Sequence, residues 1–474
     1  MLFHSPAFVL FFLAFLCFYL PIRGTRWGIP IIVVFSSIFY GSWNWKFLPL
    51  LWITIIVDYT LGNLLARTED PRRRKLMVVG SVVCNLSILG YFKYLNFIVS
   101  TLAGHSEWGA RFTLGDVILP LGISFYVFQS MSYVIDVYRR TQKPMTSLLD
   151  FAAFVTFFPH LIAGPIQRVG QLVPQLLKPD VITFNRVASG LLLFATGMFR
   201  KGLGDTLAAW HDPAFQNLAA ASPADATFAI LTFGLQIYLD FSGYSEMALG
   251  LARMLGVDLI WNFNAPYLAT SVRDFWRRWH ISLSLWLRDY LYITLGGSRV
   301  RLPVQVGNLL FTMTVCGLWH GAGWNFALWG LLHGIYLAIN VVYAKLVSER
   351  VQRFARLRAA FSWLALPVTY IAVNYAWLYF RIPTFDQAIL ANQKILAFIK
   401  HPVLPSAPVG VYEIFAVVLA LDLVSRFRGE IFPIATVLDG RRAIAYGALT
   451  AAFFIAGLVL AVGVPTQQFI YFNF

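Results

Sequence analysis

Charge is scarce in this chain of 474 residues: charged side chains make up 12% of it, against about 25% in an average soluble domain. Hydrophobic residues make up 58% and aromatic residues 16%, which is more apolar surface than a soluble fold of this size buries. Intrinsic disorder is excluded as well, because disordered chains combine few aromatic residues with many charges. The composition therefore predicts a polytopic integral membrane protein.

Cysteine is scarce too. The three cysteines, Cys17, Cys84 and Cys316, lie within apolar runs and are too few and too scattered for a disulfide framework. No cysteine and histidine spacing is typical of zinc, so we expect no metal site. No charged residue precedes Arg23 and no clear small-residue cleavage motif follows the first apolar run. We therefore interpret that run as a retained span rather than a removed signal peptide.

Apolar runs of the length needed to cross a bilayer, about 20 residues each, recur along the whole chain. The predicted spans are 5–22, 28–45, 47–65, 76–100, 117–135, 187–204, 226–248, 302–320, 322–344, 359–380, 408–425 and 443–463. The runs are continuous rather than alternating, which favours helices over the pattern of an outer-membrane barrel. We expect an all-α protein with about 11–12 transmembrane helices, plus re-entrant and interfacial helices.

The basic residues, which give a net charge of +15, cluster in short loops between the apolar runs. These loops lie at 67–75, 139–143, 273–301, 345–358 and 426–442. This placement is the positive-inside bias, so we expect cytoplasmic loops and no nucleic-acid partner. Arg200 and Lys201 are exceptions, because the same count of crossings puts them at the outer end of a span. Either a boundary is misplaced there or the two residues bind an anionic substrate.

Two segments are too irregular or too polar to cross. Segment 149–165 contains Pro159, Gly164 and Pro165, and such backbone at membrane depth is tolerated only inside protein or beside a cavity. We interpret it as a re-entrant loop. Segment 273–296 mixes arginines with tryptophans, which is typical of helices lying at the cytoplasmic interface.

A polar residue inside an apolar run is a functional candidate, because an ionisable group costs about 2.5–3.5 kcal/mol at mid-span. His320 lies near the middle of an uncharged stretch between Arg301 and Lys345. Gly321 and Gly323 follow it and should end the helix there, which opens backbone for a close approach of substrate. The alternative is a histidine that only hydrogen-bonds a neighbouring helix. A nucleophilic pair with Cys316, one helical turn earlier, is a further hypothesis, although a thiol in an apolar run is usually inert packing.

His280 stands beside Arg277, Arg278 and Trp279. Two guanidinium groups next to a histidine are suited to bind a phosphate or a carboxylate. The alternative is an interfacial anchor, with the aromatic rings among lipid headgroups and the arginines on lipid phosphate.

Asp240, Ser242, Tyr244 and Glu246 end another apolar run. Two carboxylates and two hydroxyls there indicate a lined cavity, although the two acids do not share a helical face. The alternative is an ordinary polar helix end, which fits Glu246 better than Asp240.

Long blocks follow one another in the central part of the chain: FFPHLIAGPIQR at 157–168, LQIYLDFSGYSEMALGLARMLG at 235–256, NFNAPY at 262–267, DFWRRWHISLSLWLRDYLYITLGGSR at 274–299 and GLWHGAGWNFALWGLLHG at 317–334. Together they resemble the membrane-bound O-acyltransferase family, and within it the bacterial alginate O-acetyltransferase branch more than the teichoic-acid D-alanylation branch. His160, Leu239 and Glu246 stand where this pattern usually has glutamine, an aromatic residue and aspartate.

The resemblance implies a single membrane domain over 1–474, with peripheral spans in 1–135, a central part at 150–344 and C-terminal spans in 359–474. It implies that His320 matches the catalytic histidine of the family and His280 its second polar position. It also implies a ring of helices around a central tunnel that a donor enters from the cytoplasm. The residues that we expect to line this tunnel are Asp240, Ser242, Tyr244, Trp319 and Gly321.

We therefore expect transfer of an acetyl group to hydroxyls of an exported polysaccharide, directly or through an extracytoplasmic partner protein, in a bacterial inner membrane. The donor is acetyl-CoA or a carrier-bound acyl thioester, held at Arg277, Arg278 and Trp279, and no cofactor is bound. His320 acts as the general base, since imidazole exchanges a proton near neutral pH. Alternatives are another acyl group or acceptor (D-alanyl, peptidoglycan, protein or lipid) and a proton-coupled transporter, although the two related halves common in transporters are not evident.

Overall fold

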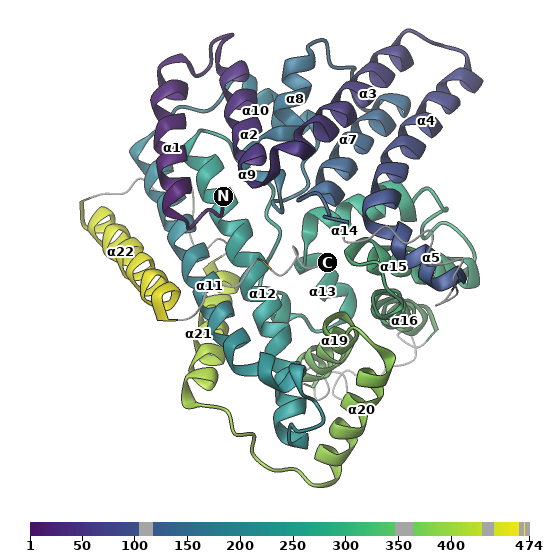
Figure 1. Cartoon of the computed structure of the whole chain (residues 1–474), viewed down its shortest axis with the longest axis vertical. Coiled ribbons are helices and arrows are strands. Elements are labelled where there is room, and N and C mark those ends of the chain that lie inside the picture. Colours follow the sequence, from purple (N-terminus) through teal and green to yellow (C-terminus); the bar gives the residue numbers. More distant parts are fainter. Residues whose placement is uncertain (104–116, 347–363, 429–439, 464–468, 470–474) are drawn as a thin grey trace. The chain divides into compact units, whose positions relative to one another are not determined.

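The computed structural model describes residues 1–103, 117–346, 364–428, 440–463 and 469 (Figure 1). Helices occupy most of these ranges and no strand occurs within them, which confirms the all-α prediction. The chain divides into two compact units, described here one at a time. Unit 1 comprises Met1–Phe194, Ser245–Ile260 and Val437–Tyr446, and unit 2 comprises Ala195–Tyr244, Trp261–Thr436 and Gly447–Phe474.

Unit 1 is built from the helices of the N-terminal part of the chain. They are α1 (Pro6–Tyr19), η1 (Leu20–Ile22), α2 (Gly28–Asn44), η2 (Trp45–Phe47), α3 (Leu48–Ala66), α4 (Pro71–Leu89), η3 (Gly90–Tyr94), α5 (Leu95–Ala103), α7 (Ile123–Tyr138), α8 (Leu148–Thr156), α9 (Phe158–Leu161) and α10 (Val169–Leu177). Capping side chains set several starts: Ser5 accepts from the backbone of α1 and Asp70 from that of α4, where Pro71 takes the first helical position.

A buried carboxylate joins three helices of unit 1. α7 packs against α3 and α4, and Figure 1 shows the three helices running beside one another. Asp58 of α3 accepts hydrogen bonds from Ser81 at 2.6 Å and Asn85 at 2.9 Å, both on α4, and from Ser130 of α7 at 2.6 Å. Such polar contacts hold membrane helices together where lipid gives no hydrophobic drive for their association.

The predicted re-entrant segment 149–165 falls on two short helices, α8 and α9, that meet at Phe157. Pro159 stands in the first turn of α9, where its missing N–H costs nothing. Residues 151–167 are buried, and Phe158 packs among the rings of Phe11, Phe15 and Phe39. Helices of nine and four residues are too short to cross a bilayer, so the break in the chain is as expected. The depth of the segment in the membrane stays a prediction.

Two long helices, α11 (Phe184–Gln216) and α12 (Pro223–Met254), run through both units. The other helices of unit 2 are η4 (Pro266–Leu268), α13 (Val272–Arg278), α14 (Ile281–Leu287), η5 (Arg288–Tyr292), α15 (Leu302–His320), α16 (Trp324–Leu346), α19 (Ala365–Arg381), α20 (Phe385–Lys400), α21 (Val409–Arg428) and most of α22 (Gly440–Gly463). The short α13, α14 and η5 occupy the segment that the sequence predicts to lie at the interface.

α15 and α16 form a closely packed helical hairpin (Figure 1). Glycines allow the approach: a Cβ at Gly317 would stand 2.1 Å from the carbonyl oxygen of Phe326, and one at Gly330 would stand 2.1 Å from that of Met313. Small residues serve the same purpose at the interfaces of membrane helices in general. α15 ends at His320 because Gly321 takes an extended backbone conformation.

Five helical stretches of the described residues are long and apolar enough to cross a membrane: Gly28–Ala66, Pro71–Leu102, Leu302–His320, Trp324–Lys345 and Ala443–Ala461. The shorter helix Pro6–Ile22 is apolar as well. α11 and α12 have 33 and 32 residues, so each is about 50 Å long, well beyond a hydrocarbon core of about 30 Å. The predicted basic loops 345–358 and 426–442, and the start of the span 359–380, lie largely outside the described residues.

Candidate functional site

His320 is the last residue of α15 and lies within unit 2 in a nest of aromatic rings. Its side chain is buried, at 3% exposure. Its ring centroid lies 4.8 Å from that of Trp319, 5.1 Å from that of Trp329 and 5.4 Å from that of Phe380. The helix ends at His320, as Gly321 and Gly323 predict, and the imidazole contacts these rings at that end.

His280 lies between α13 and α14, and its ring centroid is 6.3 Å from that of His320. Its backbone adopts the left-handed conformation, with a φ of 42°, which is strained for a residue with a side chain. The loop before α13 holds it: the N–H of Asn264 donates to the carbonyl of Arg278, and Asn262 accepts from Ser282 at 2.7 Å. Burial lowers the pKa of His280 to about 3, so its ring is neutral at physiological pH.

A third histidine, His333 of α16, belongs to the same cluster. The indole N–H of Trp276 donates to its Nδ1 at 3.2 Å, and its ring centroid lies 4.9 Å from that of Trp329. Because an indole nitrogen only donates, Nδ1 of His333 is the acceptor and the neutral ring carries its proton on Nε2. His333 is assigned no role from the sequence, although a histidine inside an apolar run is itself a candidate functional residue.

The three predicted donor-binding residues have different surroundings. Arg277 is exposed, whereas Arg278 pairs with Asp274, at 3.0 Å between Nε and Oδ2, and donates to the carbonyl of Asn264. Trp279 is fully buried among aromatic rings. Arg277 thus has its guanidinium available to an anionic ligand, and Arg278 also helps to position the loop of His280.

Asp240, a predicted tunnel residue, takes part in a buried ion-pair cluster of unit 2. Lys201 places its Nζ 2.8 Å from Oδ1 of Asp240 and 2.6 Å from Oδ1 of Asp205. Beside it Arg200 pairs with Asp422 at 3.7 Å. Both basic residues lie in the middle of α11 rather than at its end, and both pair with carboxylates of the protein. The helix continues beyond the predicted span 187–204, and where the span itself ends stays a prediction.

The remaining predicted tunnel residues have different neighbours. Ser242 accepts a hydrogen bond of 3.5 Å from Nη1 of Arg200. Tyr244 is buried and its ring stacks on that of Phe469, with 4.9 Å between centroids. Trp319 and Gly321 flank His320, and a Cβ at Gly321 would meet the ring of Phe326 at 2.1 Å. That these residues line a tunnel stays a prediction.

Two further sequence hypotheses concern sulfur and metals. Cys316 is fully buried in α15, and its thiol makes no hydrogen bond to His320 in the part of the chain that the structure describes. Within the same ranges no group of three histidine, cysteine or acidic side chains is arranged to hold a metal ion.

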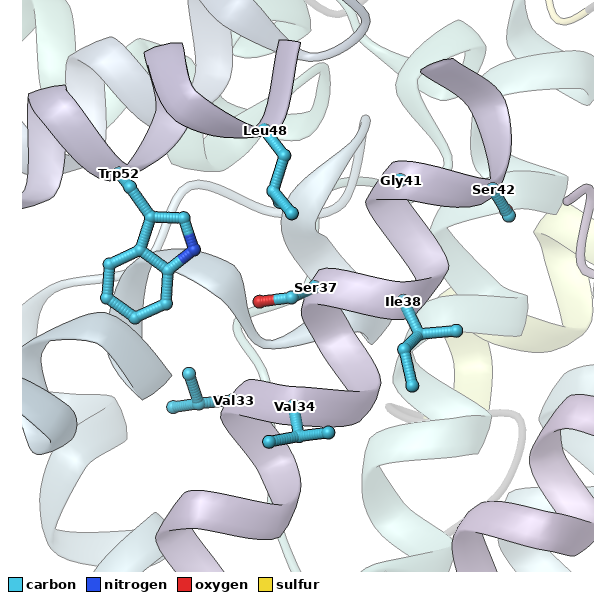
Figure 2. Close-up of a pocket in the computed structure, with 8 residues that line it drawn as sticks. All are labelled: Val33, Val34, Ser37, Ile38, Gly41, Ser42, Leu48 and Trp52. Atoms are coloured by element: carbon cyan, nitrogen blue, oxygen red, sulfur yellow. The ribbon is translucent and has the colours of Figure 1, made fainter. Parts of the chain in front are cut away.

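An open groove lies in unit 1, and none of the predicted site residues lines it. It has a volume of about 540 Å³ and is lined by Val33, Ser37 and Gly41 of α2 and by Leu48 and Trp52 of α3, among others. Figure 2 shows the side chains of Leu48 and Trp52 facing those of α2 across it. Its lining contains no histidine and no carboxylate, so it lacks the groups that acyl transfer requires.

Comparison with known proteins identifies the family. The model of the membrane-bound O-acyltransferase family matches residues 139–382, a range that contains His280, His320 and His333. The chain belongs to the membrane-bound O-acyltransferase family. It is an O-acyltransferase and an integral membrane protein, and its bacterial relatives place it in the inner membrane.

Curated relatives of this O-acyltransferase carry three kinds of name. The probable alginate O-acetylase AlgI of Pseudomonas putida is 42% identical, over 80% of this chain and 77% of its own. The peptidoglycan O-acetyltransferase of Helicobacter pylori is 34% identical, over 82% of this chain and 78% of its own. A teichoic acid D-alanyltransferase of Streptococcus thermophilus is 27% identical over 46% of this chain. The likeness to the alginate branch, read from the sequence blocks, is confirmed.

Proposed function

We propose that this O-acyltransferase moves an acetyl group from acetyl-CoA in the cytoplasm to hydroxyl groups of an exported polysaccharide. Its relatives at 34% to 42% identity are named for O-acetylation of alginate and of peptidoglycan, and both polymers present sugar hydroxyls. A protein on the outer side of the membrane completes the transfer where the polymer does not reach the site itself.

His320 is the general base in this proposal. The observation that carries it is the placement of a buried imidazole where α15 ends, beside the ring of a second buried histidine, His280. A helix that stops at membrane depth is tolerated only where its end is buried in protein or lines a cavity. A positioned base of this kind contributes about 10²–10⁴ in rate.

The other site residues take supporting roles. His280 is neutral, so it is suited to orient a hydroxyl or the second imidazole rather than to bind an anion. Arg277, exposed at the end of α13, binds a phosphate of the donor. The aromatic rings around His320 exclude water, which would otherwise hydrolyse the thioester.

The test uses the O-acetyl content of the cell-surface glycans. In a strain that lacks the chain, we expect the wild-type protein to restore O-acetylation and His320→Ala to fail at the same membrane level of protein. His401→Ala is the matched control, because His401 is exposed at the end of α20. Normal acetylation with His320→Ala contradicts the assigned role, and unchanged glycans in the deletion strain contradict the proposed acceptor.

A further inference from the structure

Acyl transfer needs a hydrogen-bond donor for the oxyanion as well as a base. The acceptor hydroxyl gives its proton to His320 while its oxygen bonds to the carbonyl carbon of the thioester, whose π electrons move onto the carbonyl oxygen. Collapse of this intermediate breaks the C–S bond, and the imidazolium returns the proton to the departing thiolate. The products are an ester and a free thiol. The negatively charged oxygen of the tetrahedral intermediate requires a hydrogen-bond donor about 2.7–3.1 Å away.

The backbone beside His320 is already engaged. The N–H of Gly321 donates to the carbonyl of Gly317, and the N–H of Gly323 donates to the carbonyl of Gly321. The backbone N–H groups of Gly321 and Gly323 therefore already have partners within the protein. The side chains around His320 offer further candidates for the donor.

Indole N–H groups are abundant around His320, but most have partners or lie elsewhere. Trp276 donates to His333, and Trp377 donates to the hydroxyl of Tyr267 at 3.2 Å. The N–H of Trp279 has no hydrogen-bond partner among the described residues, yet this ring packs on Phe263, Phe275 and Trp377 rather than on His320.

Trp329 combines both requirements. Its ring is fully buried, and its N–H has no hydrogen-bond partner in the part of the chain that the structure describes. Its centroid lies 5.1 Å from that of His320, with the two rings nearly perpendicular at 89°. A buried N–H left without a partner is unfavourable, and the oxyanion supplies that partner when it forms. The carbonyl carbon that a hydroxyl at His320 attacks would lie close to the ring of Trp329, given the 5.1 Å between the two ring centroids.

We propose that the indole N–H of Trp329 donates the hydrogen bond that stabilises the oxyanion during acyl transfer at His320. This inference rests on the proposed function, which supplies the thioester and the hydroxyl. His333, one turn further along α16, packs against the ring of Trp329, and its own bond from Trp276 fixes its orientation. The two contacts hold the indole in place for a charge that exists only in the transition state, as an oxyanion donor requires.

The sharpest test removes the N–H and keeps the ring. Trp329→benzothienylalanine replaces the nitrogen by sulfur, which donates no hydrogen bond, at nearly the same volume. We expect kcat for transfer from radiolabelled acetyl-CoA to alkali-labile ester, in membranes that carry the full chain, to fall about 10²–10³-fold. KM for acetyl-CoA should stay the same, and the midpoint of thermal unfolding should not fall, because no existing hydrogen bond is lost. Trp329→Phe should show the same loss of kcat.

Trp377→benzothienylalanine is the matched control, because Trp377 stacks on Trp329 and its N–H already has a partner. We expect this variant to unfold at a lower temperature and to keep its kcat. Wild-type kcat in Trp329→benzothienylalanine overturns the inference and leaves the proposed function intact. No transfer from acetyl-CoA by the wild-type membranes overturns the proposed function and the inference with it.

Discussion

Lys201 of α11 pairs with two buried carboxylates, and Lys201→Met should destabilise the protein strongly. Its Nζ lies 2.6 Å from Asp205 and 2.8 Å from Asp240, and the side chain is 8% exposed. At 2.8 Å and an effective dielectric constant of about 20, two unit charges attract by about 6 kcal/mol. Part of this is offset by the cost of taking the ammonium out of water. Removing one partner from a buried pair costs about 3–5 kcal/mol, and we expect a loss of that size.

The assay is thermal unfolding of purified full-length protein in one detergent. Lys178→Met is the matched control, because Lys178 is exposed just after α10 and an exposed lysine contributes little. Adding Asp240→Asn to Lys201→Met should recover part of the loss, since a neutral amide no longer needs the cation. The recovery separates the loss of the ion pair from the loss of packing by the lysine stem.

The reasoning is refuted if Lys201→Met unfolds at the same temperature as Lys178→Met. A rise in KM for acetyl-CoA with an unchanged unfolding temperature would mean that Lys201 binds an anionic substrate. The sequence left that role open, and the contacts with Asp205 and Asp240 argue against it.

Two other predictions concern unit 1 and the donor. Asp58→Leu should lower the unfolding temperature much more than Asp58→Asn. Leucine forfeits three hydrogen bonds of about 0.6–1.7 kcal/mol each, whereas the amide keeps an acceptor oxygen and offers an N–H to a serine hydroxyl. Equal unfolding temperatures of the two variants would rule out the hydrogen-bonding role of Asp58. Arg277→Gln should raise KM for acetyl-CoA without changing stability. Arg278→Gln should also destabilise the protein, because Arg278 pairs with Asp274 and donates to the loop at Asn264. An unchanged KM in Arg277→Gln would make Arg277 a lipid anchor.

The sequence predicts the helices around His320 well. Two apolar runs without charge, separated by glycines, determine α15 and α16 almost residue by residue, because length and hydropathy alone decide what crosses a bilayer. The expected spans 302–320 and 322–344 correspond to Leu302–His320 and Trp324–Leu346.

The sequence does not predict how buried charges pair. Lys201 and Asp240 lie on different helices, so no local pattern joins them. The count of crossings put the lysine at the outer end of a span, where the positive-inside bias does not expect a cation. The bond between Trp276 and His333 is long-range in the same way. α20 was missed because Phe385–Lys400 is too short and too polar to be a span, and its period is that of an ordinary amphipathic helix.

The central claim is that His320 takes the proton from the acceptor hydroxyl. The most direct measurement compares acetyl transfer from acetyl-CoA by purified wild-type protein and His320→Ala in lipid nanodiscs, with thermal unfolding recorded on the same samples. We predict that kcat falls about 10²–10⁴-fold in protein that is still folded at the assay temperature, although the lost ring contacts lower its unfolding temperature. A His320→Ala protein that folds and transfers acetyl groups at the wild-type rate would contradict the account.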